Sequence, residues 1–291
     1  MHTESPDAGG VRTRQRKRPP ASLLIGGGIV AAVVLTALIA LVWTPFDPIH
    51  AVPEERLLGP SAQHWLGTDR YGRDVAAQLM AGAHITLAVG VVAVGIGMLC
   101  GVPLGIIAGM RGGTMDALVM RGADLLLAFP ALLLAIVLGA VFGTSTWSAM
   151  AAIGIAAIPG FARVARAGTL SVLSLDFIAA AQMSQASGRA IALRHVLPNI
   201  LSLVIVQASV AFALAILAEA ALSFLGLGTP PPEPSWGRML QSAQASLYTA
   251  PQLALWPGLA IALTVLGFNL LGDGLRDLLD PRLHSTRKAG Q

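Results

Sequence analysis

The sequence is short of charge, and this shortage excludes most classes of soluble protein. Asp, Glu, Lys and Arg fill only 12% of its 291 positions, against roughly 25% in soluble globular chains. Its mean hydropathy is +0.71. So few charges cannot cover the surface of a water-soluble domain, which excludes a soluble enzyme, a secreted disulfide scaffold and a disordered chain. The composition therefore indicates a membrane protein.

Lysine and cysteine are rarer still. The two lysines, Lys17 and Lys288, each follow an arginine. A P-loop needs the sequence Gly-Lys-Ser or Gly-Lys-Thr, because the lysine reaches the β- and γ-phosphates of a nucleotide. The chain therefore contains no P-loop. Its single cysteine, Cys100, cannot form an intrachain disulfide, and we expect it to be a small buried side chain.

Motifs for catalysis or metal binding are also missing. The sequence contains neither His-Glu-x-x-His nor Gly-x-Ser-x-Gly, and its six histidines lack the spacing of metal ligands. We therefore expect no catalytic residue, no metal ligand and no cofactor site in this chain. The basic pI near 10.0 is read as a topology signal rather than as nucleic-acid binding.

Long apolar stretches are what the chain does have. A helix crosses a bilayer with about 20 residues, and six stretches reach that length: residues 21–43, 84–110, 117–142, 147–165, 199–225 and 253–273. The first stretch is too long for the core of a signal peptide, so we expect it to stay as a transmembrane helix. The predicted fold is all-α, a polytopic membrane protein with six transmembrane helices.

The distribution of basic residues predicts how the transmembrane helices are oriented in the membrane. With the N-terminus inside, 15 of the 19 lysines and arginines lie in cytoplasmic segments, and only four lie outside. The positive-inside rule therefore places both termini in the cytoplasm. We expect a disordered basic N-terminus at 1–20, an outer segment at 44–83, an inner loop at 166–197, an outer proline-rich loop at 226–252 and a cytoplasmic tail at 284–291.

Two features inside the spans are informative. Gly97, Gly101, Gly105 and Gly109 recur every four residues on one helix face, a spacing that lets a second helix approach closely. Glu219 is the one acid well inside a span. It could form a packing or loop-anchoring hydrogen bond, line or gate a path, or relay a proton.

On the outer side, the apolar positions between Trp65 and Ala83 recur at helical spacing. We expect a surface helix there, with Thr68 or Asp69 as its N-cap. The stiff proline-rich loop at 226–252 could receive a partner protein, because rigid segments lose little entropy on docking. It could also be a simple strap on the membrane surface.

The inner loop contains a short helical pattern at residues 177–183 with alanines at its centre. Pro198 suits the first turn of the helix that follows, where its missing N–H costs nothing. A helix too polar for lipid that presents Phe177 and Met183 beside alanines suits docking into a groove of another protein. A helical loop lying on the membrane surface is the alternative.

This loop resembles the EAA loop of ABC-importer permeases, with Ala179, Ala180 and Ala181 at the start of the motif and Leu197-Pro198 at its end. Residues 60–283 as a whole resemble the C-type permease subunit of the oligopeptide/dipeptide importer family. The matching stretches are 66–74 (LGTDRYGRD), 124–130 (DLLLAFP), 197–199 (LPN), 218–228 (AEAALSFLGLG), 234–237 (PSWG) and 273–282 (DGLRDLLDPR).

Two positions depart from the family motif. Ala179 stands where the motif name has Glu, and Gln185 stands where the motif has glycine. That glycine allows a turn with positive φ, which costs another residue about 1–2 kcal/mol. Either Gly188 takes over part of the turn, or the loop has a different shape.

The resemblance implies the type I ABC-importer permease fold, with a five-helix core at 84–283, in the cytoplasmic (inner) membrane of a prokaryote. The implied partners are a second homologous permease subunit, two cytoplasmic ATPase subunits that bind ATP and Mg²⁺, an external substrate-binding protein and the lipid bilayer, without nucleic acid. The implied function is to form half of the path for dipeptides, oligopeptides or related small solutes.

The resemblance also implies roles for individual residues. The coupling-loop residues are Phe177, Ala179, Ala180, Ala181, Met183, Gln185, Gly188 and Pro198. From its place inside a span, Glu219 is a candidate for the path or gate. From their place in the stiff proline-rich loop, Glu233, Trp236 and Arg238 are candidates for contact with the binding protein. An ion-coupled carrier or channel and an intramembrane enzyme remain the alternative functions. The shortage of intramembrane charge argues against a carrier, and the lack of a visible nucleophile–base pair argues against an enzyme.

Overall fold

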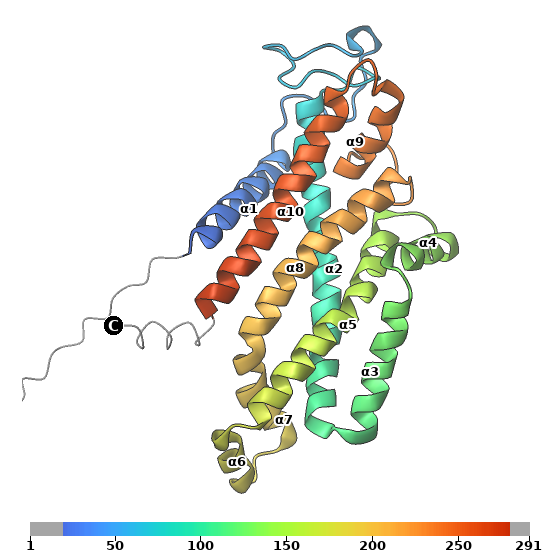
Figure 1. Ribbon diagram of the computed structural model, residues 1–291. Coiled ribbons are helices and arrows are strands. Elements are labelled where there is room, and N and C mark those ends of the chain that lie inside the picture. The colour runs from blue at the N-terminus through green and yellow to red at the C-terminus, as the bar shows by residue number, and fades with distance from the viewer. Residues whose placement is uncertain (1–19, 280–291) are drawn as a thin grey trace, which may run out of the picture.

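The computed structural model describes residues 20–279, so the basic run before residue 19 and the predicted tail at 284–291 lie outside it. Within this range the fold is helical (Figure 1). The α-helices are α1 (Ala21–Ala40), α2 (Val75–Arg111), α3 (Gly113–Ala128), α4 (Ala131–Phe142), α5 (Thr146–Leu173), α6 (Asp176–Met183), α7 (Gly188–Ile191), α8 (Leu197–Phe224), α9 (Trp236–Ala243) and α10 (Gln252–Leu279).

Five helical segments in this part of the chain are long and apolar enough to cross a membrane: α1, α2, α5, the stretch Gly188–Phe224 that includes α8, and α10. The remaining expected span, 117–142, is not one straight helix. It is divided into α3 and α4, which meet at 83°. The break falls at Phe129, which is extended at φ −90°, ψ 120°, because the residue before a proline avoids helical geometry.

The glycine ladder of α2 packs against α5, which confirms the predicted close approach and identifies the helix that docks there. A Cβ at Gly101 would lie 2.5 Å from the carbonyl oxygen of Ile158, and one at Gly109 would lie 2.8 Å from the side chain of Thr169. These neighbours leave no room for a side chain. The missing side chains therefore let the two backbones touch, as in other small-residue helix pairs in membranes.

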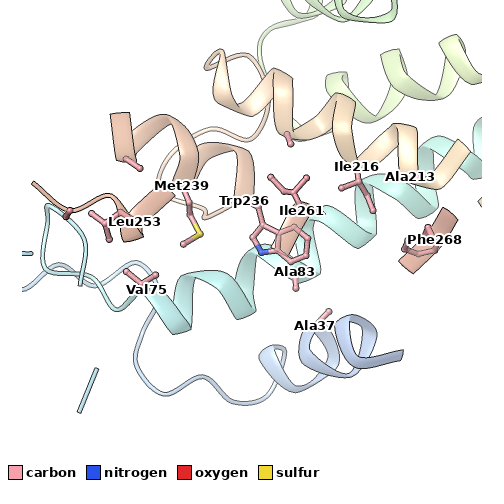
Figure 2. Packing of buried hydrophobic residues seen from close by; sticks show 13 residues of the cluster. Ala37, Val75, Ala83, Ala213, Ile216, Trp236, Met239, Leu253, Ile261 and Phe268 are labelled. Carbon is pink, nitrogen blue, oxygen red and sulfur yellow. The ribbon is translucent and has the colours of Figure 1, made fainter. Parts of the chain in front are cut away.

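A cluster of buried hydrophobic side chains holds the helices together in the outer half of the molecule (Figure 2). Trp236 of α9 lies between α2 and α10 and is only 3% exposed. Its indole N–H donates a 2.9 Å hydrogen bond to the carbonyl of Leu79, and Gly82 leaves room for its ring, since a Cβ there would lie 2.8 Å from it. Burying an aromatic ring with its polar group paired stabilises the contact between α9 and α2.

Three expectations about α2 are wrong. A separate outer surface helix from Trp65 to Ala83 does not form, because the helix begins only at Val75 and then continues without a break into the span. The N-cap is Asp74, whose side chain accepts the Ala77 N–H at 2.7 Å, rather than Thr68 or Asp69. Cys100, expected to be buried, is exposed on α2.

Candidate functional site

The inner loop forms a compact helical unit at the end of the molecule opposite the outer segment (Figure 1). Ile178 of α6 is 1% exposed and belongs to a buried cluster with Val172 of α5, Ile191 of α7 and Val196. This contact joins α6 to both neighbouring long helices. The loop is therefore packed against the helix bundle and can move together with α5 and α8.

Most other residues of α6 are exposed. Met183 is 87% exposed and Phe177 is 42% exposed, with the Phe177 ring centroid 6.0 Å from that of His195. Ala179 and Ala180 are exposed, and Ala181 is half-buried. The predicted coupling residues of α6 thus share one short helix, on which Phe177, Ala179, Ala180 and Met183 are exposed. Such a surface suits docking into a groove.

Gln185 takes the left-handed conformation of the missing glycine, with φ +54°. The Gln185 N–H donates to the Gln182 carbonyl at 3.0 Å, and the Ala186 N–H donates to the Ala181 carbonyl at 3.2 Å. These two bonds form a Schellman motif that ends α6. Gly188 does not take over the turn, since it is the first residue of α7. The loop keeps the shape of the glycine turn, and a glutamine occupies it.

The connection from the loop to α8 is helical throughout. A π-helical segment at Ala192–Val196 joins α7 to α8, and Pro198 lies in the first turn of α8. The Asn199 side-chain amide donates to the His195 carbonyl at 2.6 Å. A π-segment is a local irregularity that often marks functional sites in helices. Gly188 and Pro198 therefore lie on one continuous helical segment with α8.

Glu219 lies in the protein interior and is 1% exposed. Its Oε1 accepts a 2.7 Å hydrogen bond from the Ser223 hydroxyl, whose oxygen accepts the Thr229 N–H at 3.1 Å. This chain of bonds ties the start of the proline-rich loop to the outer end of α8. The geometry favours the loop-anchoring interpretation of Glu219 over a gate.

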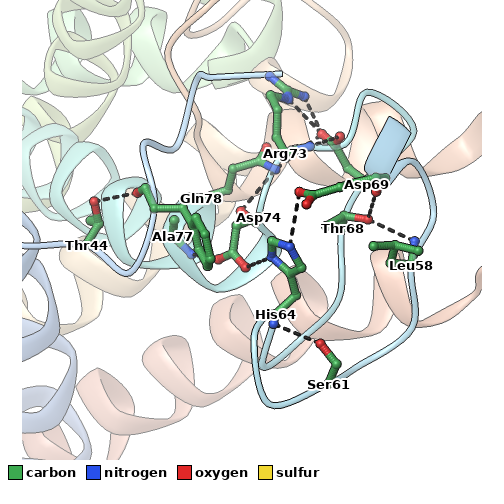
Figure 3. Close-up of polar contacts among 12 residues, drawn as sticks. Thr44, Leu58, Ser61, His64, Thr68, Asp69, Arg73, Asp74, Ala77 and Gln78 are labelled. Atoms are coloured by element: carbon green, nitrogen blue, oxygen red, sulfur yellow. Dashed lines mark hydrogen bonds and ion pairs between the residues drawn. The ribbon is translucent and has the colours of Figure 1, made fainter. Parts of the chain in front are cut away.

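The outer segment is ordered by two buried carboxylates (Figure 3). Asp69 accepts the backbone N–H groups of Tyr71 and Arg73 at 2.8 and 3.0 Å and pairs with the Arg73 guanidinium at 2.6 Å. Asp74 caps α2 and lies 2.9 Å from Nδ1 of His64. The sequence pattern Gly-Thr-Asp-x-x-Gly-Arg-Asp therefore builds a tight turn that starts α2, and sequence reasoning had missed this role.

Gly72 shows why this turn requires glycine. Its φ is +80°, and a Cβ would run into the Val52 carbonyl, with the carbonyl carbon only 2.6 Å away. Both the left-handed backbone and the close approach exclude other residues. The part of the outer segment before α2, residues 44–74, is thus a folded cap over the start of that helix.

An open cavity of about 410 Å³ lies between this cap and the proline-rich loop, lined by Arg70, Arg73, Arg238 and Glu233 among others. Burial and the nearby charge of Arg73 lower the pKa of the Arg238 guanidinium. Neither Arg70 nor Arg238 has a carboxylate within ion-pair distance among residues 20–279. The cavity is therefore suited to anionic groups.

The three candidate binding-protein contacts do not all line this cavity. Glu233 is exposed and Arg238 is half-buried, and both line it. Trp236 is buried beneath them and offers no surface to a docking protein. It is therefore removed from the contact set, and its role is to hold α9 against α2.

One pair of charged residues was also missed. Neither Asp124 nor Arg163 was predicted to form an ion pair. The structure brings them together across α3 and α5, with Nη2 of Arg163 2.5 Å from Oδ1 of Asp124. The sequence contained a signal, since Arg163 and Asp124 each lie next to an apolar run.

Comparison with known proteins is consistent with this architecture. Residues 101–285 match the family model described as binding-protein-dependent transport system inner membrane component. The chain is 43% identical over 262 residues to a dipeptide transport system permease protein of Alkalihalophilus pseudofirmus, covering 90% of this chain and 86% of the relative. It is 45% identical over 261 residues to a glutathione transport system permease protein of Salmonella typhimurium, covering 89% and 86%.

A solved chain of the MetNI methionine ABC transporter, in inward-facing conformations, shares the fold. The TM-score is 0.58 at 18% sequence identity, and the match covers 70% of this chain and 97% of that chain. The family match and the relatives together confirm the predicted resemblance. The chain therefore belongs to the binding-protein-dependent transport system inner membrane components, as a multi-pass permease subunit of an ABC importer in a prokaryotic cytoplasmic membrane that works with an ATPase and a substrate-binding protein.

Proposed function

We propose that this chain pairs with a second, different permease subunit, and that the two form a path for short peptides or related small solutes. Its sequence identity of 43–45% to permeases named for dipeptide and glutathione transport supports the choice of cargo class. In this proposal, two cytoplasmic ATPase subunits bind ATP and Mg²⁺, and an external binding protein delivers the cargo.

The proposed contact with an ATPase is the exposed surface of α6. Phe177 and Met183 would enter an apolar groove, and the small side chains of Ala180 and Ala181 would let the two surfaces approach closely. Because Ile178 packs α6 against α5, α7 and the segment before α8, a push on α6 is transmitted to both long helices. Closure of the ATPases would then tilt α5 and α8 as rigid bodies.

The proposed contact with the binding protein is the outer cavity. Arg70 and Arg238 would attract acidic side chains of that protein, since complementary charge steers association and fixes its register. We expect Arg238→Gln to raise the concentration of binding protein that gives half-maximal stimulation of ATP hydrolysis about tenfold, or ~1.4 kcal/mol. Tyr248→Ala is the matched control, because Tyr248 lies in the same loop, is fully exposed at 101% and does not line the cavity.

Unchanged stimulation in both Arg238→Gln and Glu233→Gln would refute this docking site. The proposed function as a whole is tested by reconstituting the complete importer in liposomes and measuring uptake of a labelled dipeptide. Uptake should require ATP and the binding protein. Uptake driven by an ion gradient without ATP would instead support the carrier alternative.

A further inference from the structure

The ion pair between Asp124 of α3 and Arg163 of α5 is largely exposed. The Arg163 side chain is 51% exposed and the Asp124 side chain is 62% exposed. A second pair between the same two helices, Asp116 and Arg166, is more covered, at 22% and 33%. The Asp124–Arg163 pair is therefore the more open of the two, and its charged groups remain accessible to other molecules.

The exposed pair lies in the inner part of the expected span at 147–165. Arg163 follows Trp147, near the outer start of α5, by 16 residues, which is about 24 Å along a helix at 1.5 Å per residue. The hydrocarbon core of a bilayer is about 30 Å thick. Charged side chains at such a depth are costly in lipid and nearly always face water or protein.

The exposed surface of α3 has two different sides. One side presents large apolar side chains: Leu118, Leu125 and Phe129 are 70%, 67% and 62% exposed. The other side presents Ala117, Arg121, Asp124 and Ala128, all exposed and spaced at i, i+4, i+7 and i+11 on one helical face. The first side is suited to lipid or an apolar partner, and the second is suited to water.

The polar side of α3 continues onto the neighbouring helices. Gly160 lies one turn before Arg163 on α5, and a Cβ at Gly160 would be 3.1 Å from the side-chain amide nitrogen of Gln207 on α8. Small and polar groups from three helices therefore adjoin one another. This surface, Asp124, Arg163, Gly160 and Gln207, is called the polar face below.

We propose that the polar face lines the aqueous path through this subunit, and that Arg163 and Asp124 bind the carboxylate and the ammonium group of a peptide in transit. This inference rests on the proposed function. A guanidinium binds a carboxylate through two parallel hydrogen bonds, and a carboxylate accepts hydrogen bonds from an ammonium group. In the empty path the two side chains neutralise each other, and a zwitterion can exchange partners with them.

The test is thiol labelling of the assembled complex in nanodiscs, on a Cys100→Ala background, with a charged water-soluble thiosulfonate. Ala128→Cys lies on the polar side of α3 and leaves the ion pair intact. Leu125→Cys is the matched control on the apolar side of the same helix. We expect labelling of Ala128→Cys at least tenfold faster than of Leu125→Cys. Equal rates at the two positions would overturn the assignment of the path.

The chemistry of the site is tested by protection. A dipeptide with free termini should slow the labelling of Ala128→Cys severalfold, whereas the same dipeptide acetylated and amidated at its ends should not. Equal protection by both peptides, or by neither, would refute recognition of the termini. ATP-dependent uptake is measured in parallel for unlabelled Ala128→Cys, unlabelled Leu125→Cys and the Cys100→Ala parent. Loss of uptake in all three would instead count against the proposed function.

Discussion

A left-handed residue at the end of α6 sets the shape of the cytoplasmic loop. Gln185 has φ +54°, a conformation that costs a residue with a side chain about 1–2 kcal/mol. The two backbone hydrogen bonds of the Schellman motif hold it there. The glutamine side chain is exposed, so contacts within this chain do not compensate for the strain.

We predict that Gln185→Gly relieves this strain and stabilises the loop by about 1 kcal/mol, with cargo-stimulated ATP hydrolysis preserved or improved. Gln185→Ala is the matched control, since it removes the amide but keeps the strained backbone. If both variants lose stimulation equally, the amide itself contacts the ATPase and the strain account is wrong. Stimulation is measured as the ratio of hydrolysis rates with and without loaded binding protein.

Single residues also show where sequence reasoning reached its limit. The departure at Gln185 could be predicted to matter, because a positive φ depends on the local chain. The burial of Trp236 could not be predicted, since it depends on Gly82 and Leu79, more than 150 positions away. The role of Asp74 as N-cap was missed because Thr68 and Asp69 offer the same chemistry a few residues earlier.

At the scale of helices, the packing of α2 against α5 depends on glycine. A Cβ at Gly105 would lie 2.8 Å from the Ala165 side chain and 2.9 Å from the Arg166 nitrogen, so Gly105→Ala must push the helices apart. We predict a loss of about 1–3 kcal/mol, seen as a lower Tm of the purified complex. Gly95→Ala on the same helix is the control, because nothing lies within 4 Å of its Cβ position.

An unchanged Tm for Gly105→Ala would contradict the packing account. Gly95→Ala should leave the Tm unchanged or raise it slightly, since alanine favours a helix over glycine by about 0.5–1 kcal/mol. A fall in Tm of similar size in both variants would point to a general sensitivity of α2 rather than to the contact with α5.

The presence of each helix was easier to predict from the sequence than where the helix begins or bends. Hydropathy located each apolar stretch, because burial in lipid requires about 20 apolar residues. It could not show that α2 extends outward to Val75, since residues 75–83 pack against protein and not lipid. Nor could it show the 83° bend between α3 and α4, although Pro130 marks the position of the break.

At the scale of the whole molecule, α8 links the two ends. Its inner end continues from α7 and the π-segment of the coupling loop, and its outer end holds the proline-rich loop through Glu219, Ser223 and Thr229. A movement at α6 can therefore reach the outer cavity through one helix. The sequence predicted the inner loop and the proline-rich loop. The hydrogen bonds that tie the proline-rich loop to α8 could be identified only in the structure.

The all-helical, multi-span fold and the permease family were predicted correctly, because composition, spacing and motifs are local properties of the chain. The polar face was not predicted. Asp124 and Arg163 are 39 residues apart, and hydropathy does not reveal which side of a helix faces lipid, water or protein. That distinction depends on how α3 and α5 are rotated against each other.

The most direct test of the account is the stimulation of ATP hydrolysis by loaded binding protein in complexes that carry Ala181→Trp. Overpacking a close contact costs about 1–3 kcal/mol, which should uncouple the ATPase without unfolding the helix bundle. Ala180→Trp, at an exposed position of α6, avoids a clash within the loop, and Ala181→Ser is the size-matched control. We predict that both tryptophan variants assemble with all subunits but lose stimulation and uptake, while Ala181→Ser keeps them; normal stimulation and uptake in the tryptophan variants would contradict docking through α6.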